Sequence, residues 1–361
     1  MLTRRQFLRT GTTAAAGAGL MFTGAGLLSA CGSDSGSANG NGAAAESLGK
    51  LTYQLGWIKN VEYAGSYFAE SNGYYTDAGF DSVNLLAGGP NVQGASVVVA
   101  GKALVTTSQP DVVSAAMDAG ADLVIGAALY QKNPYAIITM TDADLTTPQD
   151  FIGKKVGVDE FSVPVWNAFL AANDIDPASI EVVPVQFDSS PLPNGEVDGL
   201  LGFYISNPNN LRTAGHDVSS VLLDDFNYPL VSNTYTFRRD TYENEPEKVK
   251  AFLKAEVQGW HDAIADPVAA TKLTLDTYGK DLDLGPEEQG LEAVDQVGLI
   301  VTDESRANGI LTISPDSIDR TISSLALGGI DTTAEKLFDT TLIDEMYAEN
   351  PDLVAVPDTK A

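Results

Sequence analysis

The sequence predicts an α/β protein with two lobes and parallel or mixed sheets. Short β-rich runs alternate with helical runs between residues 51 and 130, and again between residues 135 and 225. That alternation is typical of βαβ units, which build parallel or mixed sheets. After Phe237 the chain becomes mostly helical. About 310 residues follow an N-terminal leader, which is enough for two lobes with separate cores.

In the first half of this pattern, each β-rich run is followed by a helical run that begins near a polar residue, Gly or Pro. Pro110, for example, stands where a helix can begin. The predicted strands are 51–57, 81–87, 103–108 and 122–130, and the predicted helices are 62–71, 92–100 and 111–119.

A second set of strands begins near Tyr135, and a helical tail follows the strand 231–237. The strands near Tyr135 and at 231–237 are the expected crossovers between the lobes. Predicted strands of the second set are 136–140, 155–159, 180–185, 199–204 and 219–225, with helices at 147–153 and 163–173. The tail predicts helices at 246–265, 267–278, 286–301, 315–327 and 333–349, each with Pro, Asp or Thr near its start.

The N-terminus predicts export and lipid attachment. Residues 1–30 combine a charged start, an apolar Gly/Ala-rich run and small residues before Cys31, which is typical of a cleaved signal and not of a stable membrane span. Arg4 and Arg5 match the twin-arginine type. Leu-Ser-Ala before Cys31 resembles the bacterial lipobox, whose diacylated thiol anchors a protein durably. The alternative is a buried or chance cysteine.

These features predict five segments. Residues 1–30 are the signal and 31–49 a flexible tether, because their Gly/Ser/Asn/Ala composition buries little apolar surface. Residues 50–134 begin lobe 1, 135–230 form lobe 2, and 231–361 return to lobe 1 with the C-terminal helices.

Charge and cysteine content exclude several classes of function. Of the 21 basic residues, three lie in the leader, so 18 remain against 49 acidic residues and the net charge after cleavage is −31. Nucleic acid is therefore not expected as a partner. A single cysteine allows no intramolecular disulfide and no thiolate cluster for a metal, and we expect no metal or cofactor.

Several linked segments resemble one family. They are GWIKNVEYAGSYFAESNGYYTDAGF, LLAGGPNVQ, AGKALVTTSQPDVVSAAMDAG, FIGKKVGVD, VDGLLGFY and EPEKVKAFLKAEVQGWHDAIADPVAA, and the resemblance runs from about Leu51 to the helix that ends near Ala265. Together they resemble the solute-binding components of ABC importers related to thiamine-pyrimidine-precursor and alkanesulfonate binding proteins, which have the type II periplasmic-binding-protein-like fold. The resemblance implies a two-lobed monomer with hinge strands that carries a small molecule in its cleft to the transmembrane subunits of a permease.

The candidate ligand residues follow the carboxyl ends of the predicted strands, where open α/β sheets bind ligands. In lobe 1 they are Trp57, Asn60, Glu62, Tyr63, Gly89, Asn91, Ser108 and Gln109. In lobe 2 they are Asp159, Phe161, Trp166, Tyr204, Asn207, Asp225 and Tyr228. We expect an aromatic heterocycle to stack on Trp57 or Tyr63 and to be oriented by polar groups.

Structural alternatives remain open at several of these positions. Glu62 is also a first-turn acid that the helix dipole favours, and the Gly89–Asn91 region is also an ordinary β–α turn. Tyr67 and Phe68 are expected to face the core as the buried stripe of a helix.

The residue types favour a neutral or weakly cationic heteroaromatic ligand, such as an aminopyrimidine or a flavin-like ring. No Arg occurs between Arg9 and Arg212, and Lys59 is the only cation beside the candidate site in lobe 1. The runner-up is an alkanesulfonate or another small organic anion, bound by backbone amides. An enzyme resembling a pyrimidine synthase is a weaker alternative, because His216 and His261 are the only histidines and no hydrolase or P-loop motif occurs. We therefore expect no enzyme, but an exported protein on the outer face of the cytoplasmic membrane.

Overall fold

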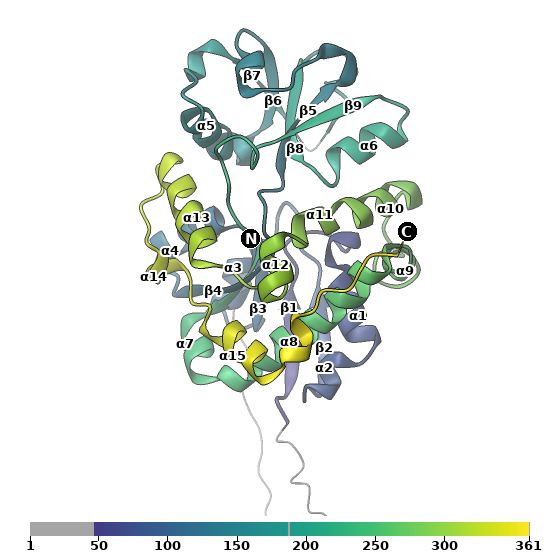
Figure 1. Cartoon of the computed structure of the whole chain (residues 1–361), viewed down its shortest axis with the longest axis vertical. Coiled ribbons are helices and arrows are strands. Elements are labelled where there is room, and N and C mark those ends of the chain that lie inside the picture. The colour runs from purple at the N-terminus through teal and green to yellow at the C-terminus, as the bar shows by residue number, and fades with distance from the viewer. Residues whose placement is uncertain (1–46, 187, 361) are drawn as a thin grey trace, which may run out of the picture. The chain divides into compact units, whose positions relative to one another are not determined.

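The computed structural model describes residues 47–186 and 188–360. Its strands form two five-stranded sheets of mixed direction, with the orders β2-β1-β3-β10-β4 and β7-β6-β8-β5-β9 (Figure 1). The predicted α/β class is therefore confirmed. The predicted signal, Arg4, Arg5, Cys31 and the tether as far as residue 46 lie outside the described residues.

The first sheet combines four N-terminal strands with one strand that returns late in the chain. β1 pairs in parallel with β2 and β3, and β10 lies antiparallel between β3 and β4. The strands are β1 Lys50–Gln54, β2 Ser82–Leu86, β3 Val105–Ser108, β4 Leu123–Tyr130 and β10 Ser232–Arg238. A 3₁₀ turn, Val61–Tyr63, leads into α1 Ala64–Ser71, and α2 Tyr74–Asp77, α3 Gly94–Val99 and α4 Pro110–Asp118 follow.

The second sheet has β5 at its antiparallel junction with β8 and β9, while β6 runs parallel to β7 and β8. Its strands are β5 Tyr135–Met140, β6 Lys155–Asp159, β7 Glu181–Val185, β8 Gly199–Phe203 and β9 Val218–Leu222. Its helices are α5 Val163–Ala172 and α6 Asn207–Thr213. The chain passes between the two sheets twice, from β4 to β5 and from β9 to β10.

The C-terminal region is helical, as predicted, but more finely divided. It contains α7 Arg239–Asn244, α8 Pro246–Ala265, α9 Pro267–Leu273, α10 Pro286–Asp295, α11 Val297–Ile300, α12 Asp303–Asn308, α13 Pro315–Leu327, α14 Ala334–Leu337 and α15 Thr341–Glu349. The predicted helix 333–349 was wrong as one element, because Phe338 forms a parallel bridge to Ile125 of β4 between α14 and α15. The predicted helix 267–278 ends in a π-helical turn, Thr274–Tyr278.

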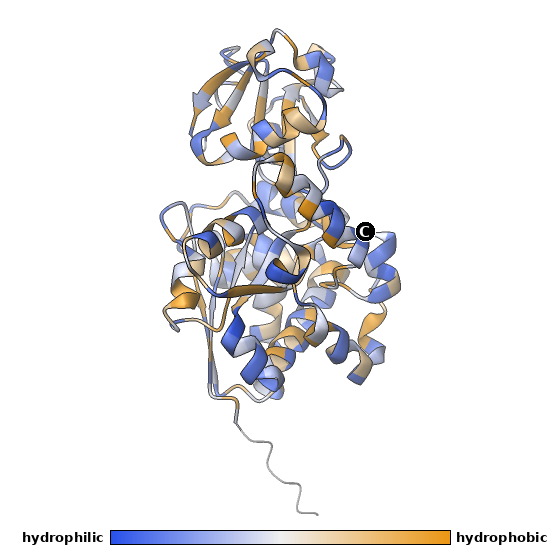
Figure 2. Ribbon diagram, turned by 90° about the vertical axis from the view of Figure 1, so that its left-hand side faces the viewer, coloured by the Kyte–Doolittle hydropathy of each residue, from blue (hydrophilic) through white to orange (hydrophobic). Residues whose placement is uncertain are grey.

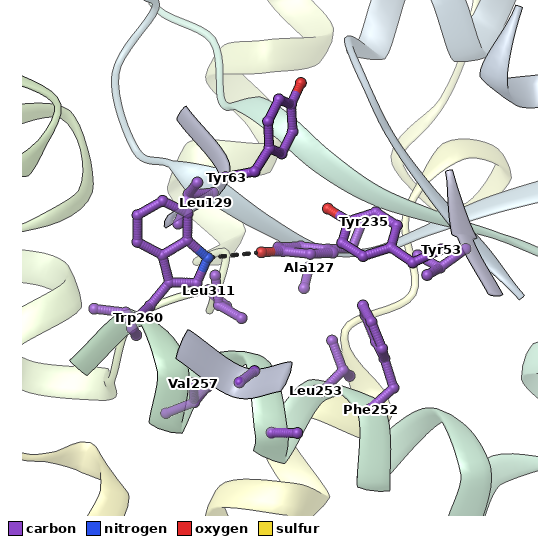
Figure 3. Packing of buried hydrophobic residues seen from close by; sticks show 14 of the residues in the cluster. Tyr53, Tyr63, Ala127, Leu129, Tyr235, Phe252, Leu253, Val257, Trp260 and Leu311 are labelled. Atoms are coloured by element: carbon purple, nitrogen blue, oxygen red, sulfur yellow. Dashed lines mark hydrogen bonds between the residues drawn. The ribbon is translucent and has the colours of Figure 1, made fainter. Parts of the chain in front are cut away.

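Hydrophobic residues recur along the strands and alternate with hydrophilic ones along the helices (Figure 2). The largest core cluster packs the first sheet against α1 and α8, with Tyr53, Tyr235, Phe252 and Trp260 at its centre (Figure 3). Trp260 Nε1 donates to the Tyr235 hydroxyl at 3.0 Å. No helix in the described part of the chain is long and apolar enough to cross a membrane.

One carboxylate, Glu256 of α8, is completely buried in this core. It accepts hydrogen bonds from Tyr235 Oη at 2.7 Å, from Ser66 Oγ at 3.0 Å and from the Tyr75 hydroxyl. These donors come from β10, α1 and α2, so the carboxylate joins three elements. Buried polar groups are tolerated when they are hydrogen-bonded in this way.

Candidate functional site

The site begins in the loop between β1 and α1, where the sequence predicts four ligand residues. Asn60, Glu62 and Tyr63 are buried, whereas Trp57 is half-buried and packs against the large core cluster. Glu62 and Tyr63 belong to the 3₁₀ turn that precedes α1. Tyr67 is fully buried and stacks on Tyr278, as expected for the core stripe.

A hydrogen-bonded network joins this loop to the start of β10. Glu62 Oε1 accepts from Asn233 Nδ2 at 2.8 Å and from the Tyr63 hydroxyl at 3.4 Å. Gln109 Nε2 donates to Asn233 Oδ1 at 3.3 Å, and Ser232 Oγ donates to Gln109 Oε1 at 2.5 Å. Two predicted residues, Glu62 and Gln109, therefore bond to Asn233 and Ser232, which sequence reasoning missed, and Tyr63 joins them through Glu62.

Asn233 is the centre of this network, which we call the Asn233 network: Glu62, Tyr63, Gln109, Ser232 and Asn233. Its φ is +48°, in the left-handed region that few residues other than glycine adopt. Such a conformation costs free energy and is retained where surrounding contacts hold it, often at functional sites. The signal in the sequence was a run of polar residues, Ser-Asn-Thr, at the start of a strand that the structure buries.

The network is polar but not cationic. Burial raises the pKa of Glu62, and hydrogen bonds, first of all from Asn233, partly oppose that shift. Burial and the nearby Glu62 carboxylate raise the pKa of Tyr63. Asn60 Oδ1 is buried and has no hydrogen-bond partner among the described residues. The arrangement therefore offers hydrogen-bonding groups and aromatic surface rather than a charged pair for an anion.

The glycine turn after β2 lies directly against the first loop. Gly88 N–H donates to the Trp57 carbonyl at 2.7 Å, and a Cβ on Gly88 would lie 2.4 Å from the Leu55 carbonyl oxygen. Only glycine allows the two loops to approach so closely. Gly89 is buried with φ +140°, Asn91 is exposed, and the Ser108 carbonyl accepts from Thr234 Oγ1 at 2.9 Å. The three β–α loops of the first sheet thus converge on β1, β3 and β10.

In the second sheet, two predicted residues make local bonds. Asp159 Oδ1 accepts from the backbone N–H groups of Phe161 and Ser162, at 2.9 and 3.1 Å, and so caps the turn before α5. Asn207 Oδ1 accepts from Phe203 N at 2.8 Å, and its Nδ2 donates to Ser189 Oγ at 3.1 Å. The ring of Phe161, in the turn that Asp159 caps, is 72% exposed.

The remaining second-sheet candidates differ in exposure. Trp166 is 1% exposed and packs against Phe169, and Tyr228 is also buried. Asp225 is exposed. Tyr204 is half-buried and packs against clusters of both sheets.

Tyr135 at the start of β5, which was not a candidate, interacts electrostatically with Asp111 of α4. Burial first and then the Asp111 carboxylate raise the pKa of both Tyr135 and Tyr228. Asp111 lies in the first turn of α4, and burial raises its own pKa although part of its side chain remains accessible. A side-chain hydrogen bond with Ser162 partly opposes the rise in the pKa of Tyr135. Tyr135 of β5 and Tyr228, which follows β9, therefore lie near the start of α4.

Metal and cavity features lie apart from this site. No group of three or more His, Cys, Asp or Glu side chains within the described ranges could hold a metal ion. One cavity of about 410 Å³ is lined by Lys132, Asp224 and Arg306, and another of about 430 Å³ by Asp122 and Arg239. Neither is lined by a residue of the Asn233 network.

Comparisons with known proteins confirm the predicted resemblance. The family model described as NMT1/THI5 like matches residues 60–270, more than half of the chain. The riboflavin-binding protein RibY of Chloroflexus aurantiacus is 26% identical over 234 residues, which are 63% of this chain and 66%, just under two thirds, of that protein.

Solved structures share the fold at low identity. A putative periplasmic sulfonate-binding protein SsuA from Methylobacillus flagellatus matches with a TM-score of 0.62 and 12% identity, over 88% of this chain and 99% of that one. The periplasmic nitrate-binding protein NrtA from Synechocystis matches with a TM-score of 0.60 and 13% identity, over 86% and 92%. The expected periplasmic-binding-protein architecture is thereby confirmed.

Proposed function

The chain belongs to the NMT1/THI5-like family, and we propose that it is the solute-binding component of an ABC importer that captures a flat heteroaromatic compound, a flavin-like ring in the first place. The observation that carries this proposal is the Asn233 network. It joins buried amide, hydroxyl and carboxyl groups to Tyr63, in the loop between β1 and α1 that also carries Trp57, without an arginine or lysine among its members.

This chemistry suits a ring that stacks and forms hydrogen bonds at its edge. Tyr and Trp rings supply large apolar surfaces with a defined stacking geometry. Ligand pockets are commonly built from such surfaces with a few convergent polar groups. The carboxyl of Glu62 accepts hydrogen bonds from Asn233 Nδ2 and from the Tyr63 hydroxyl, and carboxyl oxygens of this kind suit partners that donate, such as ring N–H or amino groups.

The likeness to the protein named for riboflavin binding supports a flavin ahead of the aminopyrimidine thiamine precursor. Both compounds carry a planar ring with nitrogen and oxygen atoms at its edge, so both agree with the residue types. We place the flavin first because that relative aligns with 63% of this chain.

An alkanesulfonate or another small organic anion is the second candidate. The solved structures named for sulfonate binding share the fold, and the exposed Asn91 and the turn at Gly89 offer backbone amides. Planar or tetrahedral oxyanions are, however, held best by arginine, alone or with helix N-termini. The lack of a cationic side chain in the Asn233 network favours the heteroaromatic ligand.

Catalysis of the pyrimidine-synthase kind has less support. His261 lies in α8, half-buried, with its pKa lowered by burial, and His216 lies between α6 and β9. Neither histidine contacts the Asn233 network in any hydrogen bond of the described residues. A mutant of DSZB in complex with biphenyl-2-sulfinic acid shares the fold at 14% identity, so the fold alone does not decide between binding and catalysis.

The rest of the proposal concerns location and partners. The leader and Cys31 support export and attachment through a diacylated N-terminus to the outer face of the cytoplasmic membrane. The ligand is then released to the transmembrane subunits of a permease after hinge closure of the lobes. We expect the protein to act as a monomer.

Calorimetric titration of the purified protein with riboflavin, an aminopyrimidine thiamine precursor and taurine tests the proposal. We expect riboflavin, or failing that the aminopyrimidine, to bind at micromolar concentration or below, and taurine to give no heat. A variant with Val268→Ala serves as the matched control, because Val268 is 79% exposed and lies on α9, away from the network. Tight taurine binding without a response to either heterocycle would refute the proposal.

A further inference from the structure

Two glutamines from the C-terminal region form hydrogen bonds with the backbone of the loop between β1 and α1, residues 55–63, which we call the ligand-binding loop. Val61 N–H donates to Gln289 Oε1 at 2.8 Å, and the Val61 carbonyl accepts from Gln296 Nε2 at 3.1 Å. Gln289 lies in α10, and Gln296 follows its last residue. Tyr130 Oη donates to Gln296 Oε1 at 3.2 Å and fixes that amide in turn. Both backbone polar groups of Val61, immediately before Glu62, are thus bonded by side chains of α10 or of the residue that follows it, and the carbonyl also accepts from Ala64 N–H.

The carboxyl end of α10 contacts α6, a helix of the second sheet's lobe. Asp295 Oδ2 accepts from Asn209 Nδ2 of α6 at 2.7 Å. Arg212 Nη1, also of α6, lies 3.9 Å from Asp295 Oδ2 and donates to Asn209 Oδ1 at 2.8 Å. Helix α6 follows β8 of the second sheet, and Figure 1 shows it beside α10.

The interior of α10 leaves little freedom between these two contacts. Gln289, Glu292 and Gln296 lie at positions i, i+3 and i+7, on one face, and all three are buried. Gln289 Nε2 donates to Glu292 Oε2 at 2.9 Å, so the amide that holds Val61 is itself held. A shift of α10 would leave several of these buried groups unpaired, which is costly, so the helix and the loop are expected to move together.

We propose that α10 couples the position of the second sheet to the geometry of the ligand-binding loop, with Asp295, Gln289 and Gln296 as positioning residues that do not touch the ligand. This inference rests on the proposed function, since it assigns a role to residues behind the same site. In such a device, loss of the α6 contact lowers the population of the binding-competent arrangement and weakens ligand binding in proportion.

The first test needs no ligand. Small-angle scattering is measured for the wild-type protein, for Asp295→Ala and for Val294→Ala, whose parent side chain is 57% exposed on the same helix. We expect Asp295→Ala to increase the radius of gyration and Val294→Ala to leave it unchanged. Identical profiles for all three proteins would overturn the coupling whether or not a flavin binds.

The second test is a double-mutant cycle on riboflavin affinity, followed by quenching of flavin fluorescence. We expect Asp295→Ala and Gln289→Leu each to raise Kd roughly tenfold, and the double variant to raise it no further than the weaker-binding single variant, because both changes break one path. Val294→Ala should stay within about twofold of wild type. Urea unfolding of each variant shows whether a loss of affinity reflects a loss of stability. If the residues had merely structural roles, their effects on Kd would be additive in the double variant.

The outcomes distinguish the two proposals. Wild-type protein that binds no flavin refutes the flavin assignment, while the scattering comparison still decides the coupling. Riboflavin binding by the wild type, with additive effects in the cycle or tighter binding by Asp295→Ala, refutes the coupling and leaves the proposed function in place.

Discussion

The buried carboxylate of Glu256 makes a quantitative prediction about stability and pH. Burial raises its pKa from 4.5 to about 6, and the hydrogen bonds from Tyr75 and Tyr235 offset only part of that shift. Between these two pH values the folded protein keeps a proton that the unfolded chain has already released. Unfolding therefore releases a proton in this window, and the free energy of unfolding falls as the pH rises from about 4.5 to 6.

The size of the effect follows from the shift. One pKa unit corresponds to 1.36 kcal/mol, so Glu256 is expected to cost about 2 kcal/mol of stability once the pH exceeds 6. Burial also raises the pKa of Glu62 and Glu292, and these groups act in the same direction. A wild-type pH profile mixes these contributions with those of other shifted acids, such as Glu70 and Asp224, whereas a substitution isolates one of them.

The substitution is Glu256→Gln, which keeps the shape of the side chain and removes its titration. Urea unfolding followed by tryptophan fluorescence is measured at pH 4.5, 5.5, 6.5 and 7.5. We expect the wild-type protein to lose about 2 kcal/mol more than the variant between the lowest and highest pH. Glu243→Gln, at an exposed position on α7, should follow the wild-type profile. Parallel profiles for wild type and Glu256→Gln would refute the reasoning.

Three further predictions concern the site, the motion and the anchor. Trp57→Ala should weaken riboflavin binding by roughly 1 to 3 kcal/mol through lost stacking and burial, measured by fluorescence titration against Val268→Ala; equal affinities would remove Trp57 from the site. Saturating ligand should close the lobes and reduce the radius of gyration in solution scattering, and an unchanged profile would indicate a rigid binder. Cys31→Ala should abolish acylation and leave the protein soluble or unprocessed after fractionation, whereas firm membrane attachment of the variant would contradict the lipobox assignment.

The alternation of strands and helices could be predicted because it depends on local patterns. The strand at 123–130, for example, was predicted as 122–130, and it is buried along its whole length. The helices α2, α6, α7 and α12 were missed, and each has only four to seven residues. Short helices depend on tertiary contacts more than on propensity, so sequence periodicity gives little signal for them.

Members of the Asn233 network could be predicted only where a residue's position at the carboxyl end of a strand brings it there. Glu62, Tyr63 and Gln109 follow the carboxyl ends of β1 and β3, and the structure joins them in one network. Asn233 was missed because its role depends on antiparallel insertion of β10 between β3 and β4, a pairing across more than 100 residues. Gln289 and Gln296 gave no local signal either, since they act on a loop more than 220 residues away.

The position of Asn233 also explains why the return strand belongs to the site and not only to the scaffold. The backbone leaves the second sheet after β9 and enters β10, where Ser232 and Asn233 are the first two residues. Asn233 holds Glu62 of the first loop with one amide atom and accepts from Gln109 of the third loop with the other. The hinge closure proposed above would act through this connection, next to Asn233, whose φ lies at +48°. On that proposal, the two hydrogen bonds of the Asn233 amide would resist a change in this φ, so we expect ligand binding and lobe motion to depend on one residue.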